Sequence, residues 1–344
     1  MATGRRRPRS AYLSNRMIAV IGVVVVLVLV LEGTSGGRLL TATNLGGAFD
    51  TAAEVGFIAI GVTMLMIGGE FDLSVGQTFV AGALTFAALF KPIGVVPAII
   101  VALLLGAGIG LVNGFVTLFF GIPSFITTLG TYYAIAGIIV IITNGSPVSL
   151  VTVPKSFAFL NGSMGPLGTQ WQVVWWLGLA VIAAVVLHRT RFGNHIFAAG
   201  GSRSAAENTG VRVVRVKMAL FVIASLSASF SGIVLFALYA DVEASAGSGL
   251  QLQAIAAAVI GGTALFGGVG TVYGGVIGSF FLGIIDVGLV LSGASTTYYE
   301  LFVGVVLIAA VVLQARAEGF GTFFRRFGLR GGVLGQRVAD RSAA

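Results

Sequence analysis

Residues Ile67 to Gly76 have the sequence IGGEFDLSVG, in which two carboxylates, a serine and three glycines interrupt an otherwise nearly continuous apolar chain. The chain is 57% hydrophobic and only 9% charged, and Glu70 and Asp72 are far in sequence from any other charged residue. A carboxylate within a bilayer costs roughly 2.5 to 3.5 kcal/mol, so it usually faces a bundle interior, a water-filled cavity or the interface. The stretch therefore predicts a break between two apolar helices.

The composition around this stretch is that of a membrane protein. The mean hydropathy is +1.02 over 344 residues, and apolar runs of about 20 residues recur along the chain. These runs are continuous rather than alternating, which favours helices over a β-barrel. The chain has no cysteine, which excludes disulfides, thiolate metal sites and cysteine nucleophiles. We expect an all-α polytopic membrane protein with about ten transmembrane helices, some of them broken or re-entrant.

Ten apolar windows are the candidate spans: 17–32, 51–69, 73–90, 94–118, 124–143, 171–188, 217–238, 253–266, 271–291 and 297–314. The eighth is short, as expected for a half-helix or re-entrant segment covered by protein or by a cavity. The first follows a basic segment, so a cleaved signal peptide is the alternative interpretation. No small-x-small cleavage site follows it, and we favour a retained helix.

The basic residues predict the orientation of these spans. Five arginines precede the first span, six basic residues lie in 189–217 and six more in 316–341, which makes 17 of 20 on one side. Only Arg38, Lys91 and Lys155 fall on the other side. The positive-inside rule then puts both termini in the cytoplasm. Membrane orientation explains the net charge of +8, and nucleic acid is not needed to account for it.

Three regions follow from this topology. They are a basic cytoplasmic N-terminal tail (1–16), a transmembrane domain (17–314) and a basic cytoplasmic C-terminal tail (315–344). The domain carries an irregular extracytoplasmic loop (144–170) and a cytoplasmic loop (189–216). In the cytoplasmic loop, Ser202 or Ser204 can cap a short helix over Ala205 to Thr209, which Gly210 would end.

Glycine is spaced by four residues in two places, at Gly106, Gly110 and Gly114 and at Gly270, Gly274 and Gly278. Small residues on one helix face let helix backbones approach closely in a membrane. We favour tight packing over a moving interface, because such stripes are common in polytopic bundles.

A short internal echo is also present. Ile67-Gly68-Gly69 recurs as Ile260-Gly261-Gly262, and each copy precedes a glycine-containing apolar span. Repeated halves with broken helices are typical of transporters, whereas chance similarity is the alternative in so glycine-rich a chain.

Enzymatic motifs are missing. None of the three lysines follows a glycine, which excludes a P-loop. His188 and His195 are too far apart for a helical metal pair, and Gly201-Ser202 and Gly162-Ser163 lack the second glycine that a serine nucleophile elbow requires. We therefore expect no catalytic, metal or cofactor site.

The isolated carboxylates leave two interpretations open. An ion-coupled carrier needs buried ionisable residues in several spans, and the candidates are Glu54, Glu70, Asp72, Asp286 and Glu300, mostly near span ends. In the second interpretation, Asp72 or Ser74 caps the helix that starts near Leu73. We favour capping, with pathway or gating roles as the alternative.

Three stretches resemble one family, the membrane-spanning permease subunits of ABC importers of the ribose, xylose and galactose type, in the broader group of branched-chain amino acid permeases. GGEFDLSVG at 68–76 is similar to the motif GG-x-DLSVG, with one residue more before the Asp. PSFITTLGT at 123–131 is similar to PSFI-x-TLGT. AIAAAVIGGTALFGGVGT at 254–271 is similar to AIAA-x-VIGGT-x-LFGG-x-GT. The resemblance runs in order from about Asn44 to Leu313.

The resemblance implies a set of partners in the bacterial cytoplasmic (inner) membrane. Two permease subunits, here expected as a homodimer, would form the pathway, with two cytoplasmic ABC ATPases below and an extracytoplasmic sugar-binding protein above. The family couples to its ATPase through a segment similar to 200–211, although Ser204 stands where a glutamate is usual. The expected coupling residues are Ser204, Ala205, Ala206, Glu207 and Gly210.

The resemblance further implies import of a monosaccharide, either a pentose, a hexose or a related polyol, by alternating access. Hydrogen-bonding side chains in the spans are the pathway or gating candidates: Glu70, Asp72, Ser74, Asn113, Ser124, Thr127, Thr128 and Gln253. The alternatives are a permease for a nucleoside or a branched-chain amino acid, an ion-coupled secondary carrier or channel, and a membrane scaffold without transport.

Overall fold

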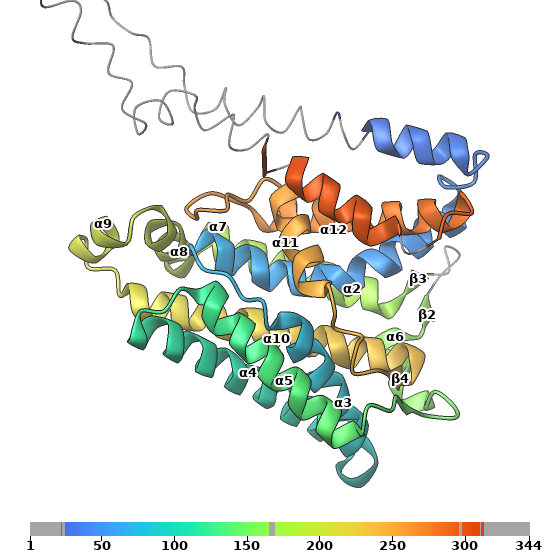
Figure 1. Ribbon diagram of the computed structural model, residues 1–344, viewed down its shortest axis with the longest axis horizontal. Coiled ribbons are helices and arrows are strands. Elements are labelled where there is room, and N and C mark those ends of the chain that lie inside the picture. Colours follow the sequence, from blue (N-terminus) through green and yellow to red (C-terminus); the bar gives the residue numbers. More distant parts are fainter. Residues whose placement is uncertain (1–21, 23–24, 165–168, 296–297, 310, 313–344) are drawn as a thin grey trace, which may run out of the picture.

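The computed structural model describes residues 22, 25–164, 169–295, 298–309 and 311–312. The predicted tails at 1–16 and 315–344 lie outside the described residues. The described chain is a bundle of helices lying side by side, with short loops at its two ends (Figure 1). This agrees with the all-α polytopic architecture expected from the sequence.

Seven long helices form most of the bundle: α2 (Ala42–Ile67), α3 (Val75–Ile93), α4 (Val95–Phe120), α5 (Ser124–Thr143), α7 (Trp171–Arg189), α10 (Val213–Tyr239) and α12 (Val272–Leu291). The shorter helices are Val25–Thr34, α6 (Ala158–Asn161), α8 (Arg191–Gly201), α9 (Arg203–Asn208), α11 (Leu250–Ile260) and Tyr298–Ala309, with one 3-10 turn, η1 (Lys155–Phe157). Two-residue strands form antiparallel pairs within loops: β1 (Val148–Ser149) with β4 (Asp241–Val242), and β2 (Ser163–Met164) with β3 (Thr169–Gln170).

Within the described residues, six helices are long and apolar enough to cross a membrane, namely α2, α4, α5, α7, α10 and α12. The described part of each of the ten predicted spans includes a helix, but the others are shorter or, like α3 with Gln77, Lys91 and Pro92, more polar. The figure of ten spans therefore stays a prediction.

Among the helices α2 to α12, three boundaries differ from the predicted spans by four residues or more. Helix α2 begins at Ala42 rather than at 51, because polar residues in its first turns lower the hydropathy without ending the helix. Helix α10 begins at Val213, four residues before Lys217. Helix α11 ends at Ile260 rather than at 266, because Gly261 and Gly262 terminate it.

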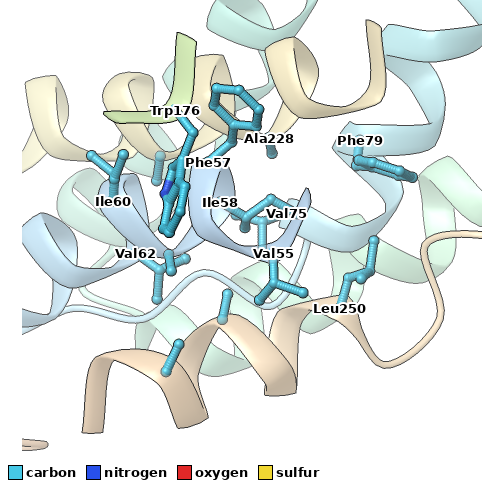
Figure 2. Close-up of a cluster of buried hydrophobic side chains, with 14 of the residues drawn as sticks. Val55, Phe57, Ile58, Ile60, Val62, Val75, Phe79, Trp176, Ala228 and Leu250 are labelled. Atoms are coloured by element: carbon cyan, nitrogen blue, oxygen red, sulfur yellow. The ribbon is translucent and has the colours of Figure 1, made fainter. Parts of the chain in front are cut away.

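Helices α2 and α10 are the centre of the bundle. Helix α2 packs against α7, α10, α11 and α12, and α10 packs against α2, α3 and α4. In its most apolar window α2 is 83% buried, whereas α5 is only 11% buried. Figure 2 shows the indole of Trp176, from α7, beside Phe57 and Ile60 of α2. A Cβ on Gly56 would overlap that indole, so glycine makes room for it.

Both glycine stripes lie in helix contacts, as the packing interpretation predicted. On α4, Cβ atoms at Gly106 and Gly110 would come within 2.7 Å of Ser229 Cβ and 2.6 Å of the Phe221 carbonyl oxygen of α10. On α12, Cβ atoms on Gly274 and Gly278 would overlap backbone oxygens of the α11 region. Because glycine has no side chain, the helix backbones can touch at these positions. Such close packing holds helices together in a membrane, where there is no hydrophobic drive for their association.

We expect Gly110→Val to destabilise the bundle, because the added side chain has no space against α10. Overpacking of this kind costs about 1 to 3 kcal/mol. Gly108→Val is the matched control, since Gly108 is on the same helix and nothing lies within 4 Å of its Cβ position. Thermal melting of the two purified variants in one detergent measures the difference, and equal melting temperatures would contradict the packing role.

The bundle has two distinct ends (Figure 1). Helices α8 and α9 project at one end, whereas α6 and the strand pairs lie at the other. The rings of Phe90 and Phe157, 5.1 Å apart, bring the end of α3 beside η1, and Arg38 donates to the Leu291 carbonyl (2.9 Å). Arg38, the last turn of α3 with Lys91 and the turn η1 with Lys155 thus lie at the end away from α8 and α9.

Candidate functional site: the helix break and the coupling segment

The break between α2 and α3 begins with a glycine cap. The N–H of Gly69 donates to the Met66 carbonyl (2.9 Å), and the N–H of Glu70 donates to the Leu65 carbonyl (3.2 Å). Gly69 has φ +81°, a left-handed conformation that glycine adopts without strain. This is the Schellman pattern, which satisfies the last carbonyls of a helix. This glycine cap therefore ends α2 at Ile67.

The internal echo has the same geometry. At the end of α11, Gly262 has φ +87°, its N–H donates to Val259, and the N–H of Thr263 donates to Ala258, each at 2.9 Å. The two Ile-Gly-Gly copies thus end their helices by the same cap, and each precedes another helix, α3 or α12.

Asp72 is fully buried at the centre of the break. Its Oδ1 accepts from the backbone N–H (2.8 Å) and the hydroxyl (2.6 Å) of Ser74, and its Oδ2 accepts from Asn113 Nδ2 of α4 (3.2 Å). Asn113 Nδ2 also donates to Ser74 Oγ (2.8 Å), and Ser225 of α10 lies against the same carboxyl. A buried carboxylate needs several donors, and these groups provide them.

The predicted cap is not formed by either side chain, since neither Asp72 nor Ser74 accepts from an N–H of the first helical turn. Asp72 instead accepts from the N–H of Ser74, the residue just before the helix. The Ser74 side chain makes no cap bond with the first turn, because its hydroxyl donates to Asp72 instead. Helix α3 consequently begins at Val75, two residues later than expected.

The first turn of α5 completes the break. Ser124 Oγ accepts from the Phe71 N–H (3.1 Å), and Thr128 Oγ1 accepts from the Leu73 N–H (2.9 Å). Both donors belong to extended residues whose N–H groups have no partner within a helix. The PSFITT stretch therefore supplies the hydrogen-bond acceptors that the GGEFDLSVG stretch lacks. Two motifs that are about 50 residues apart in sequence form one structural unit.

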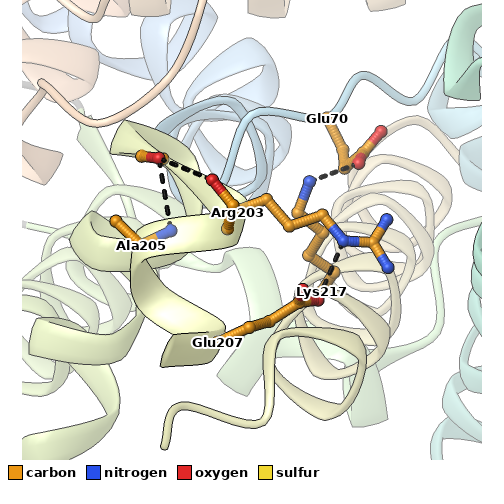
Figure 3. A network of polar contacts seen from close by, with 7 residues as sticks. Glu70, Arg203, Ala205, Glu207 and Lys217 are labelled. Atoms are coloured by element: carbon orange, nitrogen blue, oxygen red, sulfur yellow. Dashed lines mark hydrogen bonds and ion pairs between the residues drawn. The ribbon is translucent and has the colours of Figure 1, made fainter. Parts of the chain in front are cut away.

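Glu70 makes an ion pair with Lys217. Lys217 Nζ lies 2.6 Å from Glu70 Oε1, and the two side chains are only 9% and 14% exposed (Figure 3). The pair joins the break to the first turns of α10. The sequence interpretation missed Lys217, although it is the one lysine at a predicted cytoplasmic end of a span and thus a natural partner for an isolated carboxylate.

The third motif meets the same break. The N–H of Gly268, in the loop between α11 and α12, donates to the Ile67 carbonyl at the end of α2 (2.8 Å). All three stretches that carry the family resemblance therefore converge around residues 67–74.

Two pathway candidates lie apart from this cluster. Gln253 is on α11, where its Oε1 is 3.5 Å from the hydroxyl of Tyr299. Thr127 is half-buried on α5, and its hydroxyl has no hydrogen-bond partner among the described residues. Only Ser124 and Thr128 of that helix turn toward the break, because they are one turn apart on the same face.

Helices α8 and α9 form the predicted cytoplasmic segment. The hydroxyl of Ser202 accepts from the Ala205 N–H (3.4 Å), which confirms one of the two expected caps. Helix α9 starts at Arg203, two residues before the predicted start, and ends at Asn208. Gly210 follows with φ +86°, in agreement with its predicted role as the residue that ends the helix.

The α9 segment projects into solvent. From Gly201 to Gly210 every residue is exposed except Ala206, which is buried. Arg203 and Glu207 form an exposed ion pair at 2.9 Å (Figure 3). Beside α9 is a pocket of about 360 Å³, lined by Phe192, His195, Gly210, Arg212, Arg215 and Val216. The projecting turn and its basic pocket are suited to contact with another protein.

Among the residues that the structure describes, no three His, Asp or Glu side chains are grouped so that they could hold a metal ion. The arrangement offers hydrogen bonds, an ion pair and a protruding turn.

Comparison with known proteins agrees with this arrangement. Residues 44–311 match the family described as branched-chain amino acid transport system / permease component. The chain is 33% identical to the ribose import permease protein RbsC of Escherichia coli (strain K12), over 92% of this chain and 98% of the relative. It is 29% identical to the xylose transport system permease protein XylH of the same strain, over 89% and 93%. The probable ABC transporter permease protein YphD, also of that strain, is 34% identical over 86% and 88%. No solved structure matches the chain.

Proposed function

We propose that this chain, which belongs to the family of permease components of branched-chain amino acid transport systems, imports a monosaccharide, either a pentose, a hexose or a related polyol. It is an ABC importer permease and a multi-pass inner-membrane protein, and ATP hydrolysis belongs to separate subunits. The similarity to ribose and xylose permeases along almost the whole chain carries the proposal of a sugar.

In the proposed topology, ten spans put both termini in the cytoplasm. The end with α8 and α9 then faces the cytoplasm, and the end with α6 and the strand pairs faces outward. Residues 1–16 and 315–344 are cytoplasmic tails, 17–314 is the permease domain, 144–170 the outer loop and 189–216 the coupling loop. The clustering of Arg38, Lys91 and Lys155 at one end supports this orientation.

Three kinds of partner follow. A cytoplasmic ABC ATPase docks on the coupling segment, which we define as α8 and α9 with Gly210, and a sugar-binding protein delivers its cargo to the outer end. A second copy of the permease completes the pathway. The ATPase contact residues are Ser204, Ala205, Ala206, Glu207 and Gly210. Their support is that all but Ala206 are exposed on a projecting turn next to the basic pocket.

The broken helices are the moving parts of the proposed mechanism. ATP-driven closure of the ATPases pushes the coupling segment, and the bundle tilts as rigid bodies between outward and inward states. Glu70, Asp72, Ser74, Asn113, Ser124 and Thr128 act on the pathway by fixing the start of α3. Thr127 and Gln253 are separate candidates for contact with the solute.

Uptake into proteoliposomes tests the function. The permease, its ATPase and its binding protein are reconstituted with ATP in the lumen, and labelled ribose, xylose, galactose, a nucleoside and leucine are added outside. The binding protein is first screened for monosaccharides that raise its melting temperature. We expect ATP-dependent uptake of the sugar that stabilises the binding protein. Uptake without ATP that a protonophore abolishes would instead establish an ion-coupled carrier, and uptake of leucine or the nucleoside alone would refute the sugar.

A further inference from the structure

Three chain segments meet backbone to backbone at the base of the coupling segment. They are the end of α2, the end of α8 and the loop between α11 and α12. Apart from the backbone of Ile67, glycines form this contact, and we define four of them as the glycine junction: Gly69, Gly200, Gly267 and Gly268. Side chains do not separate the segments here, so no flexible atoms can absorb a relative movement.

Gly200 is the tightest position in the junction. A Cβ on Gly200 would overlap the Ile67 carbonyl oxygen and lie 2.7 Å from the Gly268 nitrogen. These two atoms are themselves hydrogen-bonded across the segments (2.8 Å). The last turn of α8 therefore packs directly against the two hydrogen-bonded groups that join α2 to the α11–α12 loop.

The other glycines extend the same contact. A Cβ on Gly267 would lie 2.8 Å from the Gly69 Cα, and one on Gly268 would lie 2.7 Å from the Gly201 Cα. Gly267 and Gly268 have φ +83° and +75°, so their left-handed turns shape the loop that reaches the junction. Both helices that end in an Ile-Gly-Gly cap are thus in contact with α8, directly or through this loop.

The Glu70–Lys217 ion pair borders the junction. The Cβ position of Gly69 is 3.9 Å from Lys217 Nζ and 3.5 Å from the Gly200 Cα. Glu70 follows Gly69 in the break, and Lys217 is in the second turn of α10. The pair therefore fixes the break to α10 at the point where α8 touches it.

We propose that the glycine junction and the Glu70–Lys217 pair position the two broken helices for coupling, by carrying movement of the ATPase-docked segment into α2–α3 and α11–α12. The proposal rests on the proposed function of the chain. Only Gly201 and the extended residue Ser202 separate Gly200 from the start of α9, so a push on α9 reaches the Ile67 carbonyl through a short backbone link. Glycine is required at position 200, because any side chain would separate the end of α8 from the end of α2 and from the α11–α12 loop.

Gly200→Ala and Gly201→Ala are the matched test. The Gly201 Cβ position has nothing within 4 Å, and neither residue has a positive φ. In proteoliposomes with ATPase and binding protein, we expect Gly200→Ala to lower the sugar moved per ATP hydrolysed by roughly tenfold, within the range usual for coupling between sites. Gly201→Ala should keep the wild-type ratio. A merely structural defect would lower transport and ATP hydrolysis in step and leave the ratio unchanged, which would overturn the proposal.

The ion pair gives a second test that does not depend on the folding of the glycine variant. Glu70→Gln and Lys217→Gln should each lower the same ratio, and the exchange Glu70→Lys with Lys217→Glu should restore part of it. Unchanged ratios in both single variants would refute the role of the pair. Wild-type protein that moves no sugar would refute the proposed function, whereas wild-type transport with an undiminished ratio in Gly200→Ala would refute only this inference.

Discussion

Replacing Arg203–Asn208 with a Gly-Ser linker of equal length is expected to abolish ATP-driven uptake and leave the bundle folded. Helix α9 contributes one buried side chain, Ala206, and its exposed ion pair adds little, since exposed pairs contribute about 0 to 1 kcal/mol. The melting temperature should therefore change little. The loss is functional, because the linker has no rigid turn for the ATPase to hold.

Co-purification of the ATPase with the permease measures this loss before any transport assay. We expect the linker variant to retain less than a tenth of the ATPase, on the order of the effect of removing a central contact cluster. The control is the same kind of linker at 151–153, an exposed stretch at the opposite end of the bundle. If ATPase binding survived in the α9 variant and failed in the 151–153 variant, the proposed orientation would be inverted.

Smaller changes in the segment separate shape from charge. Glu207→Gln removes the ion pair with Arg203 but keeps the helix, whereas a bulky residue at Gly210 forces a left-handed backbone on a side chain. We expect the first change to weaken ATPase binding only slightly, because Glu207 is one of several contact residues, and the second to impair it strongly. This order is expected if α9 contacts the ATPase as a rigid turn rather than through a charged side chain. The resemblance agrees with this, because Ser204 stands where a charged residue is usual.

The sequence predicts the break well because its causes are local. The helix cap, the left-handed turn and the start of the next helix are all determined within five residues, by Gly68, Gly69 and Asp72. The short helix after Ser202 is predicted for the same reason. In each case the residues that decide the backbone are neighbours in sequence, so composition and spacing are sufficient.

The partners across the bundle are not predictable in this way. Ser124 and Thr128 accept bonds from residues more than 50 positions away, and Lys217 pairs with a residue 147 positions away. Hydropathy windows also misplace the ends of α2 and α10, because they detect apolar content rather than helical hydrogen bonds. Polarity alone selected Gln253 together with the break residues, although the fold separates them.

Asn113→Leu is expected to destabilise the protein strongly through Asp72. Asn113 is fully buried, and its amide donates to both the Asp72 carboxylate and the Ser74 hydroxyl. Leucine has the same branched shape, although it is larger, and it donates nothing, so Asp72 Oδ2 loses the donor that α4 supplies. An unsatisfied buried group costs about 1 to 3 kcal/mol, and a charged one costs more. The start of α3 then loses its link to α4, and melting of the purified variant in detergent should occur well below the wild-type temperature.

Thr117→Val is the matched control, one turn along the same helix. Thr117 is also buried, and its hydroxyl has no hydrogen-bond partner among the described residues, so an apolar replacement of the same shape should be neutral or stabilising. Asp72→Asn in the Asn113→Leu background separates the two interpretations of the carboxylate. If Asp72 chiefly fixes the start of α3, removing its charge restores part of the lost stability, and uptake per folded molecule stays near wild type. If Asp72 gates the pathway, stability recovers while uptake does not, because the group that the gate requires has been removed.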